Sequence, residues 1–238
     1  MLSKTIWATG DIQRIHQAYQ RYAGGRDERW SGRNAGNQRI SRARFEDLQS
    51  LLQNEKLLPL AGKRILDIGC AGGGVLASLQ RLGAESGSLY GVDLREDSIR
   101  HARCAHPGLH FSVTDGQTLD FEDSSFDAAL LFTVFSSILD PDLRRKVAAE
   151  ANRVLRPGGV VLCYDMRYRS ITNPDTRPCG VSALRDLFPG YRSRVRSTTL
   201  LPPLARNLGR LTDTLYPVLN SLPPLRSHYI AVLRKPGT

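Results

Sequence analysis

Residues 65–74 read Ile65-Leu66-Asp67-Ile68-Gly69-Cys70-Ala71-Gly72-Gly73-Gly74, an apolar segment that runs directly into a glycine-rich turn. Glycines at the end of a strand allow the positive φ angles and the close backbone approach that a bound cofactor needs. Asp67 stands among apolar neighbours, where a carboxylate is costly to bury unless another group pairs with it. This stretch predicts a strand whose carboxyl end forms part of a ligand site.

Outward from this stretch, short apolar segments alternate with helical ones. Strands are expected over residues 64–68, 88–92, 109–113, 126–132 and 160–164, and helices over 75–82, 96–104 and 141–155. Strands that alternate with helices at this spacing predict a parallel sheet with right-handed crossovers, covered by helices on both faces.

The flanking segments complete the predicted architecture. Helices are expected over residues 11–22, 41–53 and 181–187, and further strands over 194–200 and 227–233, the last one antiparallel. Residues 1–62 are thus predicted to form a helical N-terminal cover, and residues 63–238 an α/β domain with a seven-stranded, mostly parallel sheet. The 26 residues 201–226 contain two Pro-Pro pairs. They predict a lid-like insertion, because connections this long in a compact domain are usually functional.

Two more acidic residues follow neighbouring predicted strands. Asp93 ends the second strand, twenty residues after Gly73, where a carboxylate can bind ribose hydroxyls. Asp115 follows the third strand and precedes Gly116. An Asp-Gly pair is also common in turns, so Asp115 carries less information than Asp93.

With these residues the sequence resembles the class I S-adenosylmethionine-dependent methyltransferase family, in particular its bacterial small-molecule enzymes. The motif D-x-G-x-G-x-G corresponds to Asp67, Gly69, Ala71 and Gly73, with alanine in place of the usual central glycine. The turn at residues 153–160 resembles the one that precedes the fifth strand of the family. The likeness extends over about residues 63–165.

The resemblance implies a Rossmann-like fold, S-adenosylmethionine as cofactor and a set of cofactor-binding residues. It implies that Asp93 binds the ribose hydroxyls and that Asp115, Gly116 and Gln117 hold the adenine. The full expected set is Asp67, Gly69, Cys70, Ala71, Gly73, Asp93, Leu94, Asp115, Gly116, Gln117 and Phe132.

A nicotinamide-dependent dehydrogenase is the nearest competing interpretation, since both classes bind a ribose through an acidic residue. A dinucleotide site has G-x-G-x-x-G leading into a helix, without an acid two residues before the first glycine. It also requires a hydride-transfer pair such as Tyr-x-x-x-Lys, which this sequence lacks. The residues therefore favour the methyltransferase.

The methyl acceptor should lie beyond the fourth and fifth strands, because parallel sheets place ligands at their carboxyl ends. For a hydroxyl acceptor, the candidate bases are Asp165, His16 and His228. Arg167 and Arg169 are candidates to clamp an anionic group by bidentate bonds. Tyr22 and Trp30 are candidates to close the site. Each of these residues has an equally simple structural role as alternative.

The formal net charge is +10, and it is unevenly distributed. Residues 63–165 hold 11 Lys/Arg against 14 Asp/Glu, whereas residues 166–238 hold 12 against 3. An anionic acceptor is therefore expected, with a solvated arginine-rich surface or an anionic membrane face as alternatives. Nucleic acid is disfavoured, because neither an N-P-P-Y-like tetrapeptide nor a Pro-Cys pair follows the fourth strand.

The remaining expectations concern class and compartment. Four cysteines without regular spacing predict reduced thiols in a cytoplasmic protein, and no metal site is expected. No signal-like start and no run of about 18 apolar residues is found. We expect methylation of a small-molecule or glycoconjugate acceptor on oxygen. N- or C-methylation of another metabolite, and cofactor binding without catalysis, stay open.

Overall fold

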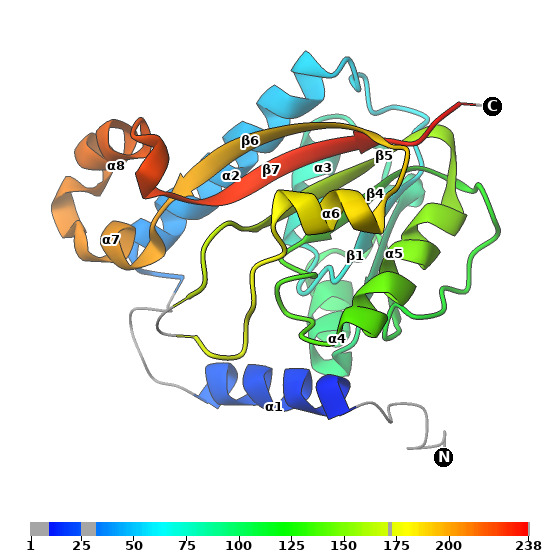
Figure 1. Ribbon diagram of the computed structural model, residues 1–238, viewed down its shortest axis with the longest axis horizontal. Helices are drawn as coiled ribbons and strands as arrows, with labels where there is room; N and C mark the ends of the chain where they lie inside the picture. The colour runs from blue at the N-terminus through cyan, green and yellow to red at the C-terminus, as the bar shows by residue number, and fades with distance from the viewer. Residues whose placement is uncertain (1–9, 25–31, 171–172, 238) are drawn as a thin grey trace.

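The sheet of the computed structural model has seven strands in the order β3-β2-β1-β4-β5-β7-β6 (Figure 1). The structure describes residues 10–24, 32–170 and 173–237. The strands are β1 Ile65–Ile68, β2 Leu89–Asp93, β3 His110–Val113, β4 Phe126–Phe132, β5 Leu155–Met166, β6 Arg192–Leu200 and β7 Arg226–Arg234. Strands β1 to β5 pair in parallel, and β7 pairs antiparallel with both β5 and β6. The predicted sheet and its antiparallel last strand are confirmed.

Helices cover both faces of this sheet. They are α1 Gly10–Gly24, α2 Ala35–Asn54, α3 Gly74–Arg81, α4 Glu96–Ala105, α5 Pro141–Val154, α6 Val181–Leu187, α7 Pro202–Asn207 and α8 Thr212–Asn220. Helices α1, α5 and α6 share one apolar cluster with the sheet, and α2, α3 and α4 share the other.

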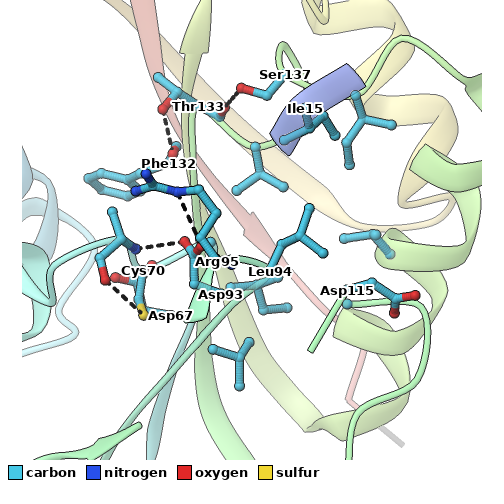
Figure 2. A pocket seen from close by; sticks show the side chains of 18 of the residues that line it. Ile15, Asp67, Cys70, Asp93, Leu94, Arg95, Asp115, Phe132, Thr133 and Ser137 are labelled. Carbon is cyan, nitrogen blue, oxygen red and sulfur yellow. Dashed lines mark hydrogen bonds and ion pairs between the residues drawn. The ribbon is translucent and has the colours of Figure 1, made fainter. Parts of the chain in front are cut away.

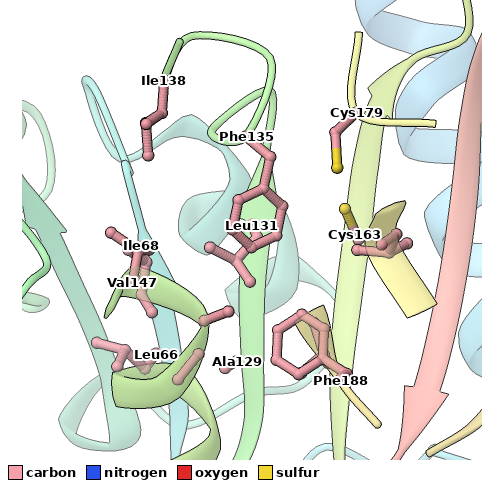
Figure 3. Packing of buried hydrophobic residues seen from close by; sticks show 14 of the residues in the cluster. Leu66, Ile68, Ala129, Leu131, Phe135, Ile138, Val147, Cys163, Cys179 and Phe188 are labelled. Carbon is pink, nitrogen blue, oxygen red and sulfur yellow. The ribbon is translucent and has the colours of Figure 1, made fainter. Parts of the chain in front are cut away.

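Strand β4 shows why both layers form. Its residues are apolar at successive positions, so Ala129 and Leu131 enter one cluster while Leu130 and Phe132 enter the other. Figure 3 shows Ala129 and Leu131 packed beside Val147 of α5. A strand buried on both faces is characteristic of a central parallel strand.

Two element boundaries differ from the prediction. Helix α2 begins at Ala35 instead of residue 41, because the Asn34 side chain caps it by accepting hydrogen bonds from the backbone N–H groups of Gly36 and Asn37. Strand β5 extends from Leu155 to Met166 instead of covering only 160–164. Its register with β4 shifts between Phe126 and Ala128, so the part of the predicted turn (residues 153–160) that follows α5 is an irregularity within the strand.

The predicted insertion folds as helices α7 and α8 with short 3-10 turns at Gly209–Leu211 and Pro223–Leu225. Because β6 is antiparallel to β7, and β7 to β5, β6 runs parallel to β5. The connection from β6 to β7 therefore lies at the carboxyl edge of the parallel strands. The insertion packs on α2, and in Figure 1 it forms the end of the molecule beyond β6 and β7.

Helix α2 belongs to the predicted N-terminal cover, yet it joins two parts of the molecule. Its Leu48 and Leu52 lie in the apolar cluster of the sheet, while its Ala43 packs with Tyr216 of the insertion. Among the described helices, none has the length and apolar character needed to cross a bilayer.

Candidate active site

A cavity of about 260 Å³ opens at the carboxyl ends of β1, β2 and β4. Strands β2 and β3 are added on one side of β1, and β4 and β5 on the other. Open α/β sheets bind their ligands at the point where the strand order changes side in this way, which here lies between β1 and β4. Nine of the eleven cofactor-binding residues expected from the sequence line it: Asp67, Gly69, Cys70, Ala71, Asp93, Leu94, Asp115, Gly116 and Phe132 (Figure 2). The remaining two, Gly73 and Gln117, do not line it, although each is next in the chain to a residue that does.

The turn after β1 takes its shape from two glycines with positive φ. Gly69 has φ 77°, and a Cβ there would lie 2.7 Å from the Val134 side chain. Gly73 has φ 78° and caps α3, and a Cβ there would lie 2.6 Å from the Phe111 ring. Ala71 also adopts a left-handed conformation, with φ 47°. The left-handed conformation costs an alanine roughly 1 kcal/mol. The family usually has glycine at this position.

Asp93 ties the β1 turn to β2. One carboxylate oxygen accepts a hydrogen bond of 2.9 Å from the Ala71 N–H, and the other accepts one of 2.9 Å from the Arg95 N–H. A carboxylate has about four acceptor positions. Two therefore remain for hydroxyl groups of a ligand in the cavity that Asp93 lines.

Asp67 is the least compensated charged group of the site. It is 1% exposed, and neither carboxylate oxygen has a hydrogen-bond partner among the described residues. Burial, and secondly the negative charge of Asp93, raise the pKa of Asp67 to about 8, whereas the positive charge of Arg44 opposes this shift. A buried carboxylate without partners calls for a cation or donor from a ligand.

Arg44 of α2 lines the same cavity and was not identified from the sequence. Its guanidinium lies 5.7 Å from the centroid of the Tyr164 ring, and the described part of the chain supplies it with no hydrogen bond or ion pair. The cavity thus presents a carboxylate and a guanidinium together. The amino and carboxylate groups of the methionine portion of S-adenosylmethionine match these two charges.

The other end of the cavity is apolar on one side and polar on the other. Residues from α1, from the loop after β4 and from α5 form the apolar wall: Ile12, Ile15, Ile138, Leu143 and Val147. On the polar side, Asp115 accepts hydrogen bonds of 2.9 Å and 2.8 Å from the backbone and side chain of Gln117. Gln117 therefore acts through Asp115. An apolar wall facing a polar edge suits a flat ring with polar edges.

None of the three candidate bases lines the cavity. Asp165 is fully buried, and its carboxylate accepts hydrogen bonds from the N–H groups of Ser136 at 3.0 Å and Met166 at 2.7 Å. Burial raises its pKa to about 6. Asp165 therefore fastens the loop after β4 to β5.

His228 and His16 are placed differently from each other. His228 stacks on Tyr164 with ring centroids 4.8 Å apart, and burial lowers its pKa to about 4, so it is neutral at pH 7. His16 is partly buried on α1, next to Ile15 of the cavity wall.

The two arginines expected to clamp the acceptor do not line the cavity. Arg167 donates hydrogen bonds to the carbonyl oxygens of Pro223 and Arg226, and so holds the end of the insertion. Arg169 is exposed. The side chain of Tyr22 and the whole of Trp30 lie outside the described residues.

Comparison with known proteins finds likeness to methyltransferases. Residues 65–159 match the family model described as a methyltransferase domain. Over 110 residues the chain is 41% identical to phthiotriol/phenolphthiotriol dimycocerosates methyltransferase 1 of Mycobacterium ulcerans, and 42% identical to fatty-acid O-methyltransferase of Mycolicibacterium smegmatis. Each match covers 45% of this chain and 39% of the relative, so the chain matches well under half the length of these curated relatives.

A solved structure extends the likeness in fold. The crystal structure of a SAM-dependent methyltransferase from Archaeoglobus fulgidus superposes with a TM-score of 0.59 over 80% of this chain and 94% of that one, at 16% identity. The comparisons thus show a match to a methyltransferase domain over residues 65–159 and, over most of the chain, the fold of a solved SAM-dependent methyltransferase.

Proposed function

We propose that this protein transfers the methyl group of S-adenosylmethionine to an oxygen atom of a small amphipathic acceptor, with a lipid carboxylate as the first candidate. The observation that carries the proposal is the cavity in which Asp67 and Arg44 stand together beside the Asp93 carboxylate. The name of one curated relative, fatty-acid O-methyltransferase, supports the acceptor class.

Different residues of the cavity would bind different parts of the cofactor. Asp67 and Arg44 would hold the methionine portion, Asp93 the ribose hydroxyls, and Asp115 with Gly116 the adenine. The cofactor supplies a methyl group already activated by its sulfonium. The protein therefore contributes alignment, which by itself provides a large share of the rate of a displacement reaction.

The acceptor would approach beside the carboxyl end of β4. Phe132 lines the cavity there, and its ring centroid lies 5.6 Å from that of Tyr164. The next residue, Thr133, has φ 58° and donates a 2.6 Å backbone hydrogen bond to the Tyr164 carbonyl. A β-branched residue with positive φ is strained, and such strain is concentrated at functional sites.

A carboxylate acceptor suits the positions of the candidate bases. Carboxyl groups have an ordinary pKa of about 4, so at neutral pH the attacking oxygen carries no proton to be removed. Alignment of oxygen, methyl and sulfur is then sufficient, and Asp165, His16 and His228 need not reach the acceptor. A hydroxyl acceptor is the alternative, in which a base would have to act.

Calorimetric titration with S-adenosylmethionine and S-adenosylhomocysteine tests the cofactor site, on the unmodified protein and on Asp93→Ala. We expect micromolar binding that the variant largely loses. Transfer of labelled methyl to fatty acids, hydroxylated lipids and anionic glycosides then separates the acceptor classes. Binding without transfer to any class would favour a non-catalytic cofactor-binding protein, and absence of binding by the folded protein would overturn the proposal.

We further propose that the protein acts in the cytoplasm. Cys70, Cys163 and Cys179 are buried free thiols, and Cys104 is an exposed one. Free thiols of this kind are usual where the surroundings are reducing.

A further inference from the structure

The outer side of the insertion carries an unusual set of exposed apolar side chains. Leu211 is 58% exposed, Val218 61% and Leu222 50%, which makes three of the five large exposed apolar residues in the described part of the chain. A fourth, Tyr168, directly follows β5 at the same edge of the sheet. Isolated exposed apolar residues are ordinary, but a contiguous group indicates an interaction site.

Two of the apolar residues here share a helix face, and two flank that helix. Leu215, which is half-buried, and Val218 lie three positions apart on α8. Leu211 ends the 3-10 turn before α8, and Leu222 follows its C-terminal cap. Thr212 and Tyr216 occupy the opposite face and are buried. We name the outward set of Leu211, Leu215, Val218 and Leu222 the apolar stripe.

The inward face of the insertion is firmly fixed, so the stripe cannot turn inward without unfolding. The Tyr216 hydroxyl accepts a hydrogen bond from the Leu200 N–H at 3.3 Å, and the Arg39 guanidinium lies 4.8 Å from the Tyr216 ring centroid. The backbones of α2 and α7 are in close contact, since a Cβ on Gly36 would lie 2.3 Å from the Ala205 carbonyl oxygen. The stripe is therefore a permanent feature of the surface.

The charge around the stripe is positive. Residues 201–226 contain three arginines and one aspartate, within a C-terminal segment of 12 Lys/Arg and 3 Asp/Glu. Arg210 precedes Leu211 directly and is exposed. Arg42 of α2 forms an exposed ion pair with Asp213 at 3.7 Å, so this pair adds no net charge and Arg210 supplies the positive charge beside the stripe. Apolar side chains flanked by arginines are the features of a surface that lies on anionic lipid.

We propose that the apolar stripe and Arg210 bind the protein to the surface of an anionic lipid bilayer. The insertion lies at the carboxyl edge of the sheet, where the cofactor cavity also opens. Binding in this way would turn that edge toward the lipid. The inference does not depend on the identity of the methyl acceptor or on catalysis.

Co-sedimentation of the full chain with vesicles tests this proposal. Phosphatidylcholine vesicles with and without phosphatidylglycerol are the probe, at low and high salt. We expect binding to the anionic vesicles that weakens with salt. Two variants should each bind the anionic vesicles at least about ten-fold more weakly than the unmodified protein. They are the triple variant Leu211→Ser, Val218→Ser, Leu222→Ser and the single variant Arg210→Glu.

Matched controls lie on β3 and α4, at the opposite end of the strand order from β7 and β6. Val113→Ser removes a 38% exposed apolar side chain from β3, and Arg100→Glu reverses an exposed arginine of α4. Both should bind vesicles like the unmodified protein. Calorimetric titration with S-adenosylmethionine should be unchanged in the triple variant, which shows that the cofactor site is intact.

Two results would overturn the proposal. One is vesicle binding that is absent, or that is equal in the unmodified protein and the triple variant. The other is a dimer of the unmodified protein in sedimentation-velocity runs that the triple variant converts to a monomer without any change in vesicle binding. The stripe would then be an interface between two copies of the chain.

Discussion

Replacing Asp67 with asparagine should stabilise the cofactor-free protein and at the same time weaken cofactor binding. Burial raises the pKa of Asp67 to about 8, whereas an aspartate in an unfolded chain titrates near its ordinary value of about 3.9. Between these two values the folded protein holds a proton that the unfolded chain has released. The free energy of unfolding therefore falls as pH rises, by about 1.4 kcal/mol per pH unit.

Asparagine has no such titration, and its amide occupies nearly the same space. The stability advantage of Asp67→Asn should thus be small near pH 4, grow with pH, and level off above pH 8. At pH 7 the difference works out to about 4 kcal/mol. Urea unfolding of both proteins at several pH values measures this difference directly, because its slope with pH follows from one titrating group.

Cofactor binding should respond in the opposite direction. At about a hundred times its dissociation constant, S-adenosylmethionine should stabilise the unmodified protein by roughly 2.7 kcal/mol. The asparagine variant should lose most of this gain, since the ligand's ammonium loses its carboxylate partner. Binding by the unmodified protein should also strengthen as pH rises toward 8, because the ligand requires the ionised form of Asp67.

Asp93→Asn is the matched control for Asp67→Asn. Its carboxylate accepts two backbone N–H groups, so the substitution should destabilise the protein by about 1–3 kcal/mol instead of stabilising it. If Asp67→Asn is no more stable than the unmodified protein at pH 8, or if the difference does not grow with pH, the buried and unpaired carboxylate is not what limits stability.

Three further substitutions probe other parts of the structure. Ala71→Gly relieves the left-handed strain and should raise the free energy of unfolding by about 0.5–1 kcal/mol, measured by urea unfolding; a loss of stability would contradict the φ of 47°. Arg44→Met keeps the side-chain length and should weaken S-adenosylmethionine binding about ten-fold in calorimetry without lowering the melting temperature, and unchanged affinity would remove Arg44 from the site. Gly36→Ala forces a methyl group onto the Ala205 carbonyl and should lower the free energy of unfolding by about 1–3 kcal/mol. Increased proteolysis of the insertion is the readout, and an unaffected protein would show that α2 and α7 are not in tight contact.

The central sheet could be predicted because its signals are local. The apolar runs of β1 and β4 and the glycine turn after β1 can each be recognised from a short stretch of sequence. The cofactor residues follow from these runs, since the carboxyl ends of adjacent parallel strands meet at one edge. Nine of the eleven expected cofactor residues accordingly line one cavity.

The acceptor side could not be predicted in this way, because it depends on packing between distant segments. Asp165 was expected just beyond a strand ending at residue 164, but β5 continues to Met166, and Asp165 pairs with Tyr229 inside the sheet. Arg44 was missed for the opposite reason. An arginine on a helix has no local pattern that distinguishes a cavity-facing side chain from a solvated one, and only the packing of α2 against the sheet places it.

The two ends of the insertion meet on adjacent strands. Leu200 pairs with Arg226, and the Leu201 N–H donates a 2.9 Å hydrogen bond to the Leu225 carbonyl. Neighbouring strands are about 4.8 Å apart whatever connects them, and lengthening a connection changes its closure entropy only slowly. The segment between these residues is therefore replaceable: it can be shortened, lengthened or exchanged during evolution while the sheet register and the cofactor turn stay unchanged. The proposed surface partner and the proposed methyl-transfer chemistry can then diverge independently in this architecture.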